Sequence, residues 1–581
     1  MKKILTFLAI FIATTLFAQN TYVPGDNFET YLETHDASGN TVAMGDATSM
    51  GNGVMDDYVS TANISSVATL NVSSQSISDL TGVQDFTALT NLFCNDNQLA
   101  SLDVANNNYL TELRCYNNQL TSLDVTNNTA LTKLNCYNNQ LTSLDVSNNV
   151  TLTSLVCPSN QLTSLYVTNN TALTELNCYS NQLTSLDVSS NTALTKLDCF
   201  SNQLTSLDVS NNASLTELFC FSNQLTSLDV SSNTALTNLR CYSNQLTTLD
   251  VTNNTALTNL GCYGNSLTSL DISSNTALTK LNCYSNQLTS LDVSNNIDLI
   301  ELYCYSNQLT SLDVSSNTAL TKLFCASNPL TSLDISNNTV LTELNCFNNQ
   351  LTSLDVTNNT ALTKLRCSFN QLTNLDVTNN TALTKLFCYT NQLTSLDVTN
   401  NTALTDLRCS NNPLTSLDVT NNTALTKLFC TNNQLTFLDL KNGNNTNVAN
   451  ADFDATNNPN LTCILVDDAA YSTTNWTNID ATSTFVNNQA ECDALSVAEN
   501  SFETQINLYP NPAKDSFSIQ NDSNTTITKI SIYNILGKLV LQTNHTNAAI
   551  DVSTLKNGIY LVKITSDSNK TVIQKIVVNK F

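Results

Sequence analysis

A chain of 581 residues is too long for a single globular core, so it contains either several domains or an array of stacked repeats. Its 47 acidic and 22 basic residues give a formal charge of -25, which repels nucleic acid and anionic membranes alike. We therefore expect no nucleic-acid partner.

Residues 1–18 have the layout of a secretory signal peptide. Two lysines precede an apolar run from Ile4 to Phe17, and Ala18 supplies the small residue expected before the cleavage point. The run is too short for a spanning helix, and no later stretch approaches the ~20 apolar residues that a membrane span needs. We expect an exported mature chain without a transmembrane segment.

Residues 19–88 are expected to form an N-terminal cap and the first irregular repeats. The sequence predicts a short helix around Asn27 to Thr34, followed by a Gly- and Asp-rich loop at residues 45–57. The spacing of this loop matches no known metal-binding loop, so a solvated turn is the favoured interpretation.

A period of 21 residues dominates the next part of the chain. Seventeen of the nineteen cysteines recur at this spacing, from Cys94 to Cys430, and such a period is typical of a solenoid. The coil at residues 131–151 reads LTKLNCYNNQ and then LTSLDVSNNVT, so each coil has two similar sides. Apolar and polar residues alternate on both sides, which predicts half-buried strands with their apolar side chains facing inward.

The pattern LxxLxCxxNxL resembles the leucine-rich-repeat consensus over residues 89–445, with Cys in the third apolar position. Residues 77–92, ISDLTGVQDFTALTNL, resemble the repeats of bacterial internalins, which are adhesive surface proteins. The resemblance implies a mainly β fold: a solenoid of about 17 coils of 21 residues with parallel strands. Because LDV stands where many leucine-rich repeats have a helix, we expect strands on both sides and a flatter stack.

Two asparagine columns also follow the period, one from Asn97 to Asn433 and one from Asn107 to Asn422. An asparagine at a corner of each coil can bond the backbone of adjacent coils, so both columns are predicted to be structural.

The cysteine column is interpreted as a row of small buried hydrophobic side chains. Parallel strands would place neighbouring Cβ atoms ~4.8 Å apart, against the ~3.8 Å typical of a disulfide. Metal binding needs converging ligands, which a single file does not offer, so no metal or cofactor is expected. Cys463 and Cys492 stand outside the column in a predicted C-terminal cap, residues 446–492, and are expected to form a disulfide.

The aspartate of LDV occurs in almost every coil, from Asp103 to Asp439, with Tyr166 as the exception. These side chains are expected to point outward, where a row of like charges needs compensation. Hydrogen bonds from Ser and Thr, such as Ser143 and Ser147, are the main interpretation. Calcium held between successive carboxylates is the alternative.

On the cysteine side the outward positions vary, and aromatic and arginine side chains dominate them. Such residues supply much of the binding energy at interfaces, whereas the opposite side repeats TSLDV almost unchanged. An equal alternative is that the rings stack between coils only for stability. The candidate ligand-binding residues are Arg114, Tyr116, Tyr137, Tyr179, Phe200, Phe221, Arg240, Tyr242, Tyr263, Tyr284, Tyr303, Tyr305, Arg366, Tyr389 and Arg408.

After a predicted linker at residues 493–507, residues 508–581 alternate as the short strands of a β-sandwich do. The segments LYPNPAKD, ISIYNILGK and IDVSTLKNGIYLVKI resemble the type A sorting domain of the type IX secretion system. The resemblance implies that the secretion machinery recognises this domain and that the cargo is then released or attached to the outer-membrane surface.

These features favour a non-enzymatic binding protein, an adhesin or receptor for a protein or glycan. No convergent acid-base pair, activated nucleophile or phosphate loop points to an enzyme, and no catalytic residue is predicted. The alternative is a structural surface-layer or spacer protein without a specific ligand.

Overall fold

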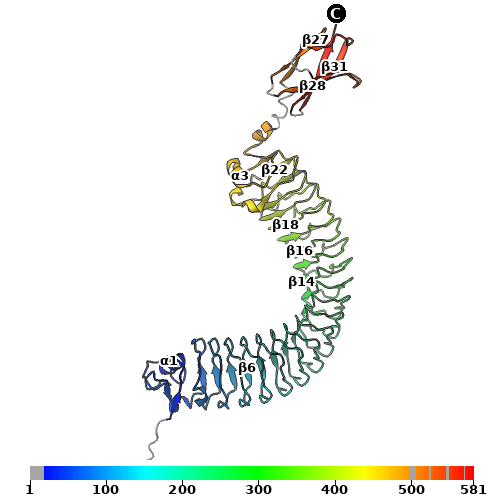
Figure 1. Cartoon of the computed structure of the whole chain (residues 1–581). Helices are drawn as coiled ribbons and strands as arrows, with labels where there is room; N and C mark the ends of the chain where they lie inside the picture. Colours follow the sequence, from blue (N-terminus) through cyan, green and yellow to red (C-terminus); the bar gives the residue numbers. More distant parts are fainter. Residues whose placement is uncertain (1–18, 496–504, 523–524, 545–547, 568–569) are drawn as a thin grey trace, which may run out of the picture. The chain divides into compact units, whose positions relative to one another are not determined.

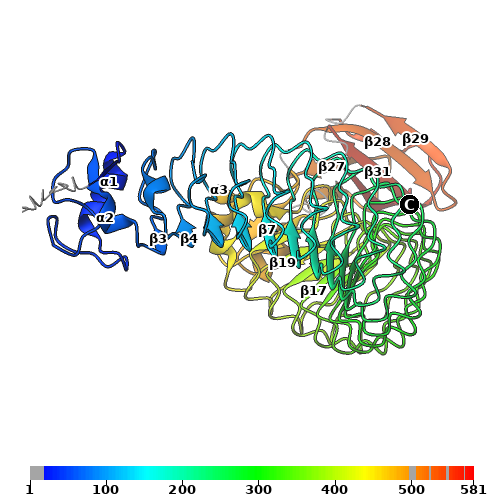
Figure 2. The same ribbon diagram turned by 90° about the horizontal axis from the view of Figure 1, so that it is seen from below.

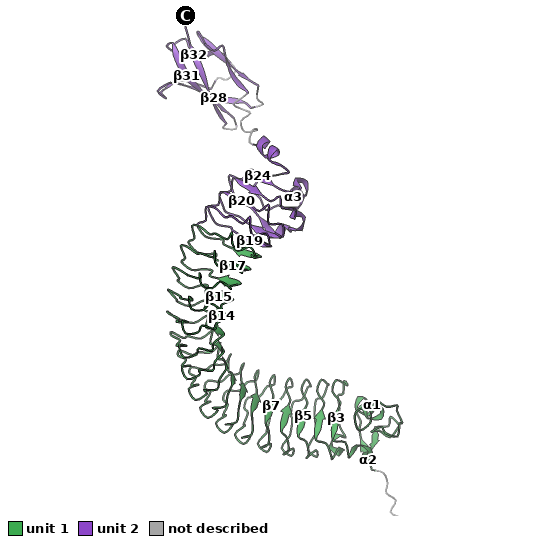
Figure 3. Cartoon of the chain, turned by 180° about the vertical axis from the view of Figure 1, so that it is seen from behind, with its two compact units in different colours: residues 1–391 green, residues 392–581 purple. Residues whose placement is uncertain are grey.

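The computed structural model describes residues 19–495, 505–522, 525–544, 548–567 and 570–581 (Figure 1). The predicted signal peptide, residues 1–18, lies outside these residues. The chain divides into two compact units, residues 1–391 and residues 392–581 (Figure 3). Within the described ranges, no helix combines the length and the apolar character needed to cross a membrane.

The chain begins with a small mixed cap, visible beside β3 in Figure 2. Strands β1 (Asn20–Tyr22) and β2 (Tyr58–Ser60) pair antiparallel, and the helices are α1 (Asp26–Thr34) and α2 (Thr61–Ile64). Helix α1 confirms the short helix expected in this region.

The Gly- and Asp-rich loop wraps around a buried carboxylate of α1. The Glu33 oxygens accept the backbone N–H groups of Asn52 and Gly53, at 2.6 and 2.7 Å. Gly51 lies so close to this carboxylate that a Cβ atom there would meet it at 2.1 Å. The loop is thus a turn, as expected, but a buried side chain holds it rather than solvent.

The solenoid of the first unit is a stack of coils with one short parallel strand each. Every strand pairs in register with its neighbours, so that Leu218 lies opposite Leu239, for example. This arrangement confirms the predicted parallel-strand solenoid with a 21-residue period. The strands are β3 (Thr69–Asn71), β4 (Asn91–Phe93), β5 (Glu112–Arg114), β6 (Lys133–Asn135), β7 (Ser154–Val156), β8 (Glu175–Asn177), β9 (Lys196–Asp198), β10 (Glu217–Phe219), β11 (Asn238–Arg240), β12 (Asn259–Gly261), β13 (Lys280–Asn282), β14 (Glu301–Tyr303), β15 (Lys322–Phe324), β16 (Glu343–Asn345), β17 (Lys364–Arg366) and β18 (Lys385–Phe387).

Asparagines at the coil corners join successive coils, as predicted. Asn202 donates from Nδ2 to the carbonyls of Cys178 and Cys199, both at 3.1 Å, and its Oδ1 accepts Leu183 N–H at 3.0 Å. In the other column, Asn212 donates to the carbonyls of Val188 and Asn191 at 3.0 and 2.8 Å. These bonds satisfy backbone groups that would otherwise be buried without partners.

The prediction of strands on both sides of the coil is wrong for most coils. Among the described residues of the first unit, the LDV side pairs only as an isolated bridge between Asp103 and Asp124. The reason is local: Asp145 Oδ1 accepts the backbone N–H of Ser147 at 2.9 Å, which turns the chain directly after LDV. A stack tied by strand pairing on one side can widen on the other, and the first unit bends accordingly (Figure 3).

In the second unit, β19 (Asp406–Arg408), β21 (Lys427–Phe429) and β23 (Phe453–Asp454) continue the parallel pattern. Here the LDV side does form strands, in a second parallel sheet that ends in the cap together with helix α3 (Ala469–Asn475). The Cys463–Cys492 disulfide closes the cap, with Cα atoms 5.6 Å apart, and confirms the predicted pair. The strands of this sheet are β20 (Ser416–Asp418), β22 (Phe437–Asp439), β24 (Cys463–Leu465) and β25 (Thr484–Val486).

The tail is a small sandwich of two antiparallel sheets, as predicted. Phe517, Ile532 and Val562 are among the side chains buried between the sheets. The predicted linker at residues 493–507 falls largely outside the described residues. One sheet contains β26 (Ile506–Tyr509), β27 (Ser516–Asn521) and β30 (Ile550–Asp551), and the other β28 (Ile527–Asn534), β29 (Leu539–Thr543), β31 (Gly558–Ser566) and β32 (Thr571–Val578).

Candidate functional site

The candidate site is the strand face, defined here as the outward residues of strands β4 to β18 together with the residue after each cysteine. The middle residue of each strand points into the core, so the first and third residues and the residue after cysteine are left to face outward. All candidates named from the sequence up to Tyr389 lie on this face of the first unit. Arg408 has the equivalent position in the second unit.

The aromatic residues after cysteine form a continuous stack from Tyr179 to Tyr305. Adjacent ring centroids are 4.0 to 4.2 Å apart, and the planes differ by 9 to 15°. Tyr116 and Tyr137 form a separate stacked pair at 4.5 Å. The ring faces within the stack are therefore covered by neighbouring rings, and a ligand would meet ring edges and hydroxyl groups instead.

The pKa values of the hydroxyls of Tyr242, Tyr263, Tyr284 and Tyr305 are raised above their ordinary value, so these groups remain protonated at neutral pH. Burial raises the pKa of Tyr284 to about 12. The hydrogen bond with Tyr263 lowers this pKa and that with Tyr305 raises it, both by less than burial does. Burial also raises the pKa of Tyr242 and Tyr263 above their ordinary value. Along this stretch the face thus presents neutral groups that can donate and accept hydrogen bonds.

Each candidate arginine lies over an aromatic ring of an adjacent coil, which orients its guanidinium group. The distances from Cζ to the ring centroid are 4.5 Å for Arg114, 4.7 Å for Arg240, 5.1 Å for Arg366 and 5.0 Å for Arg408. Arg114 also forms an ion pair with Glu112 at 2.6 Å, whereas Arg240 has no ion pair with any described residue. Ring contacts alone leave the charge of Arg240 available to a ligand.

Charged residues at the first strand position pair across coils. Lys280 and Lys322 both contact the carboxylate of Glu301, at 2.7 and 3.0 Å, and Lys364 contacts Glu343 at 2.9 Å. These pairs are partly exposed, so each contributes little to stability. The ion pairs nevertheless hold the lysine ammonium groups at defined positions on the strand face.

The opposite side of the coils, here called the aspartate face, is bonded differently. Asp124 Oδ1 accepts both the backbone N–H and the hydroxyl of Thr126, at 2.9 and 2.6 Å, and these bonds lower the pKa of Asp124. The predicted partner Ser147 is confirmed for Asp145, while no described hydrogen bond joins Ser143 to an aspartate. Tyr166 replaces the aspartate in one coil and is exposed. The calcium alternative stays a prediction.

None of the seventeen column cysteines forms a disulfide and all are buried, as predicted. Burial raises the pKa of the Cys241 thiol to about 12, so this thiol does not ionise at neutral pH. Within the described ranges, no three or more His, Cys, Asp or Glu side chains gather in a way that could hold a metal ion.

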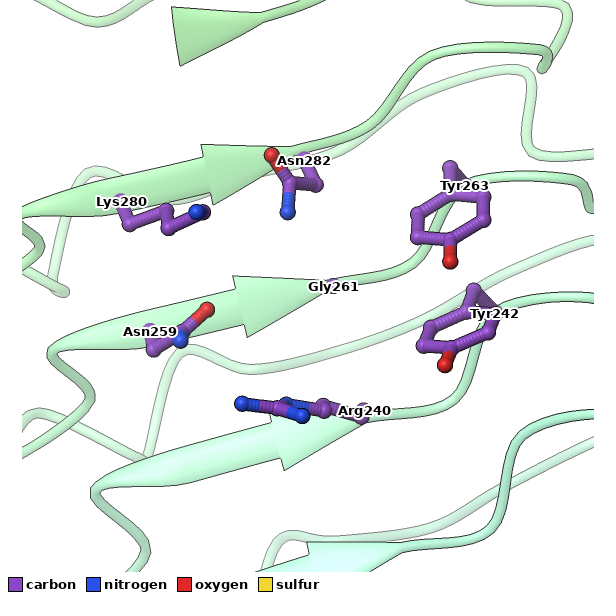
Figure 4. A pocket seen from close by; sticks show the side chains of 7 residues that line it. All are labelled: Arg240, Tyr242, Asn259, Gly261, Tyr263, Lys280 and Asn282. Atoms are coloured by element: carbon purple, nitrogen blue, oxygen red, sulfur yellow. The ribbon is translucent and has the colours of Figure 1, made fainter. Parts of the chain in front are cut away.

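One hollow interrupts the strand face, and the sequence did not single it out. It has a volume of about 220 Å³ and lies at Gly261, between Arg240 and Lys280 (Figure 4). Asn259, Asn282 and two tyrosines complete its lining. The available signal was Gly261 itself, since every other coil carries a side chain at the position before cysteine.

Comparisons with known proteins agree with this architecture. Residues 507–579 match the family model described as secretion system C-terminal sorting domain, so the tail is a type IX sorting domain. The functional domain of InlJ from Listeria monocytogenes, described as including a cysteine ladder, is 29% identical with a TM-score of 0.51. That match covers 97% of this chain and 99% of the InlJ chain.

YopM from Yersinia enterocolitica shares the fold at 22% identity and a TM-score of 0.54, over 72% of this chain and 91% of YopM. Ulvan lyase NLR42 from Nonlabens ulvanivorans is 32% identical over 123 residues. That overlap is 21% of this chain and 22% of the lyase. The chain thus spans about a fifth of that enzyme.

Proposed function

We propose that this leucine-rich-repeat solenoid with a type IX sorting domain is a secreted or surface-displayed binding protein without enzymatic activity. The strand face would dock a protein or glycan, in the manner of an adhesin or receptor. The observation that carries the proposal is the contrast between faces: coils with the same core present varied outward residues on the strand face and almost unchanged ones on the aspartate face.

Backbone bonding supports this division. On the strand face the backbone ladder joins successive coils whatever the outward side chains are, so those side chains can change from coil to coil. On the aspartate face, the side chains themselves close the turns through bonds such as that between Asp124 and Thr126. Variation at one surface of a rigid scaffold is typical of binding surfaces.

The second candidate function is a structural spacer without a specific ligand. The aromatic stack from Tyr179 to Tyr305 favours it, because parallel rings at 4.0 to 4.2 Å stabilise neighbouring coils without any ligand. Specific binding by the mature chain would contradict this alternative.

The test is a glycan array and a surface pull-down with the mature chain and with one variant. In the variant, every strand-face tyrosine and arginine of residues 240–305 is replaced by Ser or Asn. The mature chain should bind a ligand that the variant does not bind. Recovery of no ligand in either assay would contradict the binding function and favour the spacer.

Export is tested separately, by a chain that ends before Leu508. The sandwich has its own core around Phe517 and Ile532, so its removal should leave the solenoid folded. Cell fractionation should find the shortened chain in the periplasm, because the sorting signal is gone. Efficient delivery of the shortened chain to the surface would contradict the role given to the tail.

A further inference from the structure

The hollow at Gly261 combines the Arg240 guanidinium with two side-chain amides that have no hydrogen-bond partner among the described residues. The Arg240 guanidinium has the Phe219 ring below it and no carboxylate within ion-pair distance among the described residues. The side-chain amides of Asn259 and Asn282 make no hydrogen bond within the described chain, and Asn282 Oδ1 is a buried acceptor without a partner. Figure 4 shows Arg240 and Lys280 on either side of the Gly261 strand.

This hollow lies in a strip whose charge opposes that of the whole protein. From β11 to β18 the strand face has more cations than carboxylates, whereas the chain as a whole has a charge of -25. A local positive strip on an acidic protein attracts anions to one place and repels them elsewhere. The cations are Arg240, Lys280, Lys322, Lys364, Arg366 and Lys385, and the carboxylates are Glu301 and Glu343.

A second hollow, of about 180 Å³, lies in the same strip. Lys364, Arg366 and Lys385 line it, together with Glu343, which already pairs with Lys364. Four coils separate Asn345 in this hollow from Gly261 in the first, which corresponds to about 19 Å at the usual strand spacing. One extended ligand can therefore contact both hollows.

We infer that the strip binds a linear acidic polysaccharide, with the carboxylate or sulfate of one sugar unit seated in the Gly261 hollow between Arg240 and Lys280. This inference rests on the proposed binding function and names its ligand chemistry. Arg240 offers a charge-assisted pair to the anion, and Lys280, already paired with Glu301 at 2.7 Å, adds a second, shared cation.

The remaining lining suits sugar hydroxyls. The amides of Asn259 and Asn282 and the hydroxyls of Tyr242 and Tyr263 both donate and accept hydrogen bonds, as ring hydroxyls require. A volume of about 220 Å³ is below the usual range for drug-sized ligands of about 300–1,000 Å³ and fits a single small unit of a longer chain. Nucleic-acid binding is disfavoured because such proteins are typically basic, whereas the sequence pI is 4.2.

The test is calorimetric titration of the full mature chain with oligogalacturonate and with heparin oligosaccharides, the first carrying carboxylates and the second also sulfates. Methyl-esterified oligogalacturonate, which lacks the charge, and poly-glutamate, which lacks the sugar, serve as control ligands. We expect binding of at least one charged oligosaccharide, no binding of the ester, and tighter binding by chains long enough to span both hollows.

Two substitutions target the hollow with residues that other coils already contain. Arg240→Asn introduces the residue found at Asn135 and Asn177, and Gly261→Asn that found at Asn282. A Cβ at Gly261 would meet its nearest neighbour, in Tyr242, at an ordinary 3.6 Å, so the coil can accept it. Each variant should weaken binding about tenfold or more, a loss of about 1.4 kcal/mol, with an unchanged melting temperature.

Arg114→Asn is the matched control, since Arg114 has the same column position and charge but pairs with Glu112 away from the hollow. It should leave binding unchanged. An equal loss in Arg114→Asn, undiminished binding of the methyl ester, tighter binding of poly-glutamate, or no binding of any charged oligosaccharide would overturn the inference. A ligand found on the strand face but indifferent to Arg240→Asn would overturn it while leaving the proposed function intact.

Discussion

The strand face and the aspartate face of each coil are built from similar sequence segments, yet they are held together by different bonds. On the strand face the backbone pairs with the backbone, as between Leu218 and Leu239. On the aspartate face a carboxylate accepts the amide two residues later, as Asp250 does from Thr252 at 2.9 Å. Side chains that carry structural bonds are less free to vary than side chains outside the backbone ladder, so the strand face is the one that can acquire a binding role.

The largest effect is expected where the two faces join. Asn202→Ala removes the bonds to the carbonyls of Cys178 and Cys199, which keep their bonds from neighbouring asparagines, and leaves the buried N–H of Leu183 without a partner. The expected cost in the free energy of unfolding is about 3 kcal/mol, since the unpaired N–H costs about 1–3 kcal/mol and each lost hydrogen bond to a carbonyl about 0.5–1.5 kcal/mol.

Chemical denaturation of the purified chain measures this loss. Arg240→Asn, which changes an outward residue near the same coils, is the control and should cost less than about 0.5 kcal/mol. Equal losses in the two variants would mean that outward side chains of the strand face are as structural as the corner asparagines.

The next largest effect is the pH dependence of stability, to which the aspartate face contributes. Hydrogen bonds from Ser and Thr lower the pKa of many aspartates of the aspartate face, including Asp124, Asp250 and Asp355, below the ordinary value of 3.8. Since the folded pKa is lowered, this stabilisation is present above the unfolded pKa and is lost as pH falls through the folded pKa. The melting temperature should be flat near neutrality and fall below about pH 4.

Differential scanning calorimetry across this range tests the expectation. Replacing Thr126 and Thr252 by Val removes their hydroxyl donors to Asp124 and Asp250, and should make the acid dependence shallower. A melting temperature that rises on acidification would show that repulsion within the aspartate column outweighs these bonds.

The smallest effect is expected from metal removal. Because Ser or Thr partners already bond Oδ1 of aspartates along the column, excess EDTA should leave the melting temperature of the solenoid unchanged. A marked fall in EDTA, restored by added calcium, would establish calcium between the carboxylates and make the aspartate face a metal-binding surface.

The repeat period made the solenoid, its inward residues and the corner asparagines predictable, because a fixed spacing exposes each structural column directly. The Cys463–Cys492 pair was predictable from its position outside the column. The prediction of strands on the LDV side was wrong for most coils. Alternating apolar residues indicate an extended segment, but they do not show whether its backbone pairs with that of the next coil. The hollow was not predicted because it exists where Gly261 has no side chain, and the absence of a side chain produces no sequence motif.

The most direct test of a binding role for the strand face is oxidative footprinting of the full mature chain, alone and with the highest-affinity ligand from the array. Tyr242, Tyr263 and Tyr284 report on the strand face. Tyr166, 75% exposed and in the aspartate column, is an internal control for the opposite face. We predict that the ligand protects the three stacked tyrosines and leaves Tyr166 unchanged; protection of Tyr166 without protection of the stack would contradict the account.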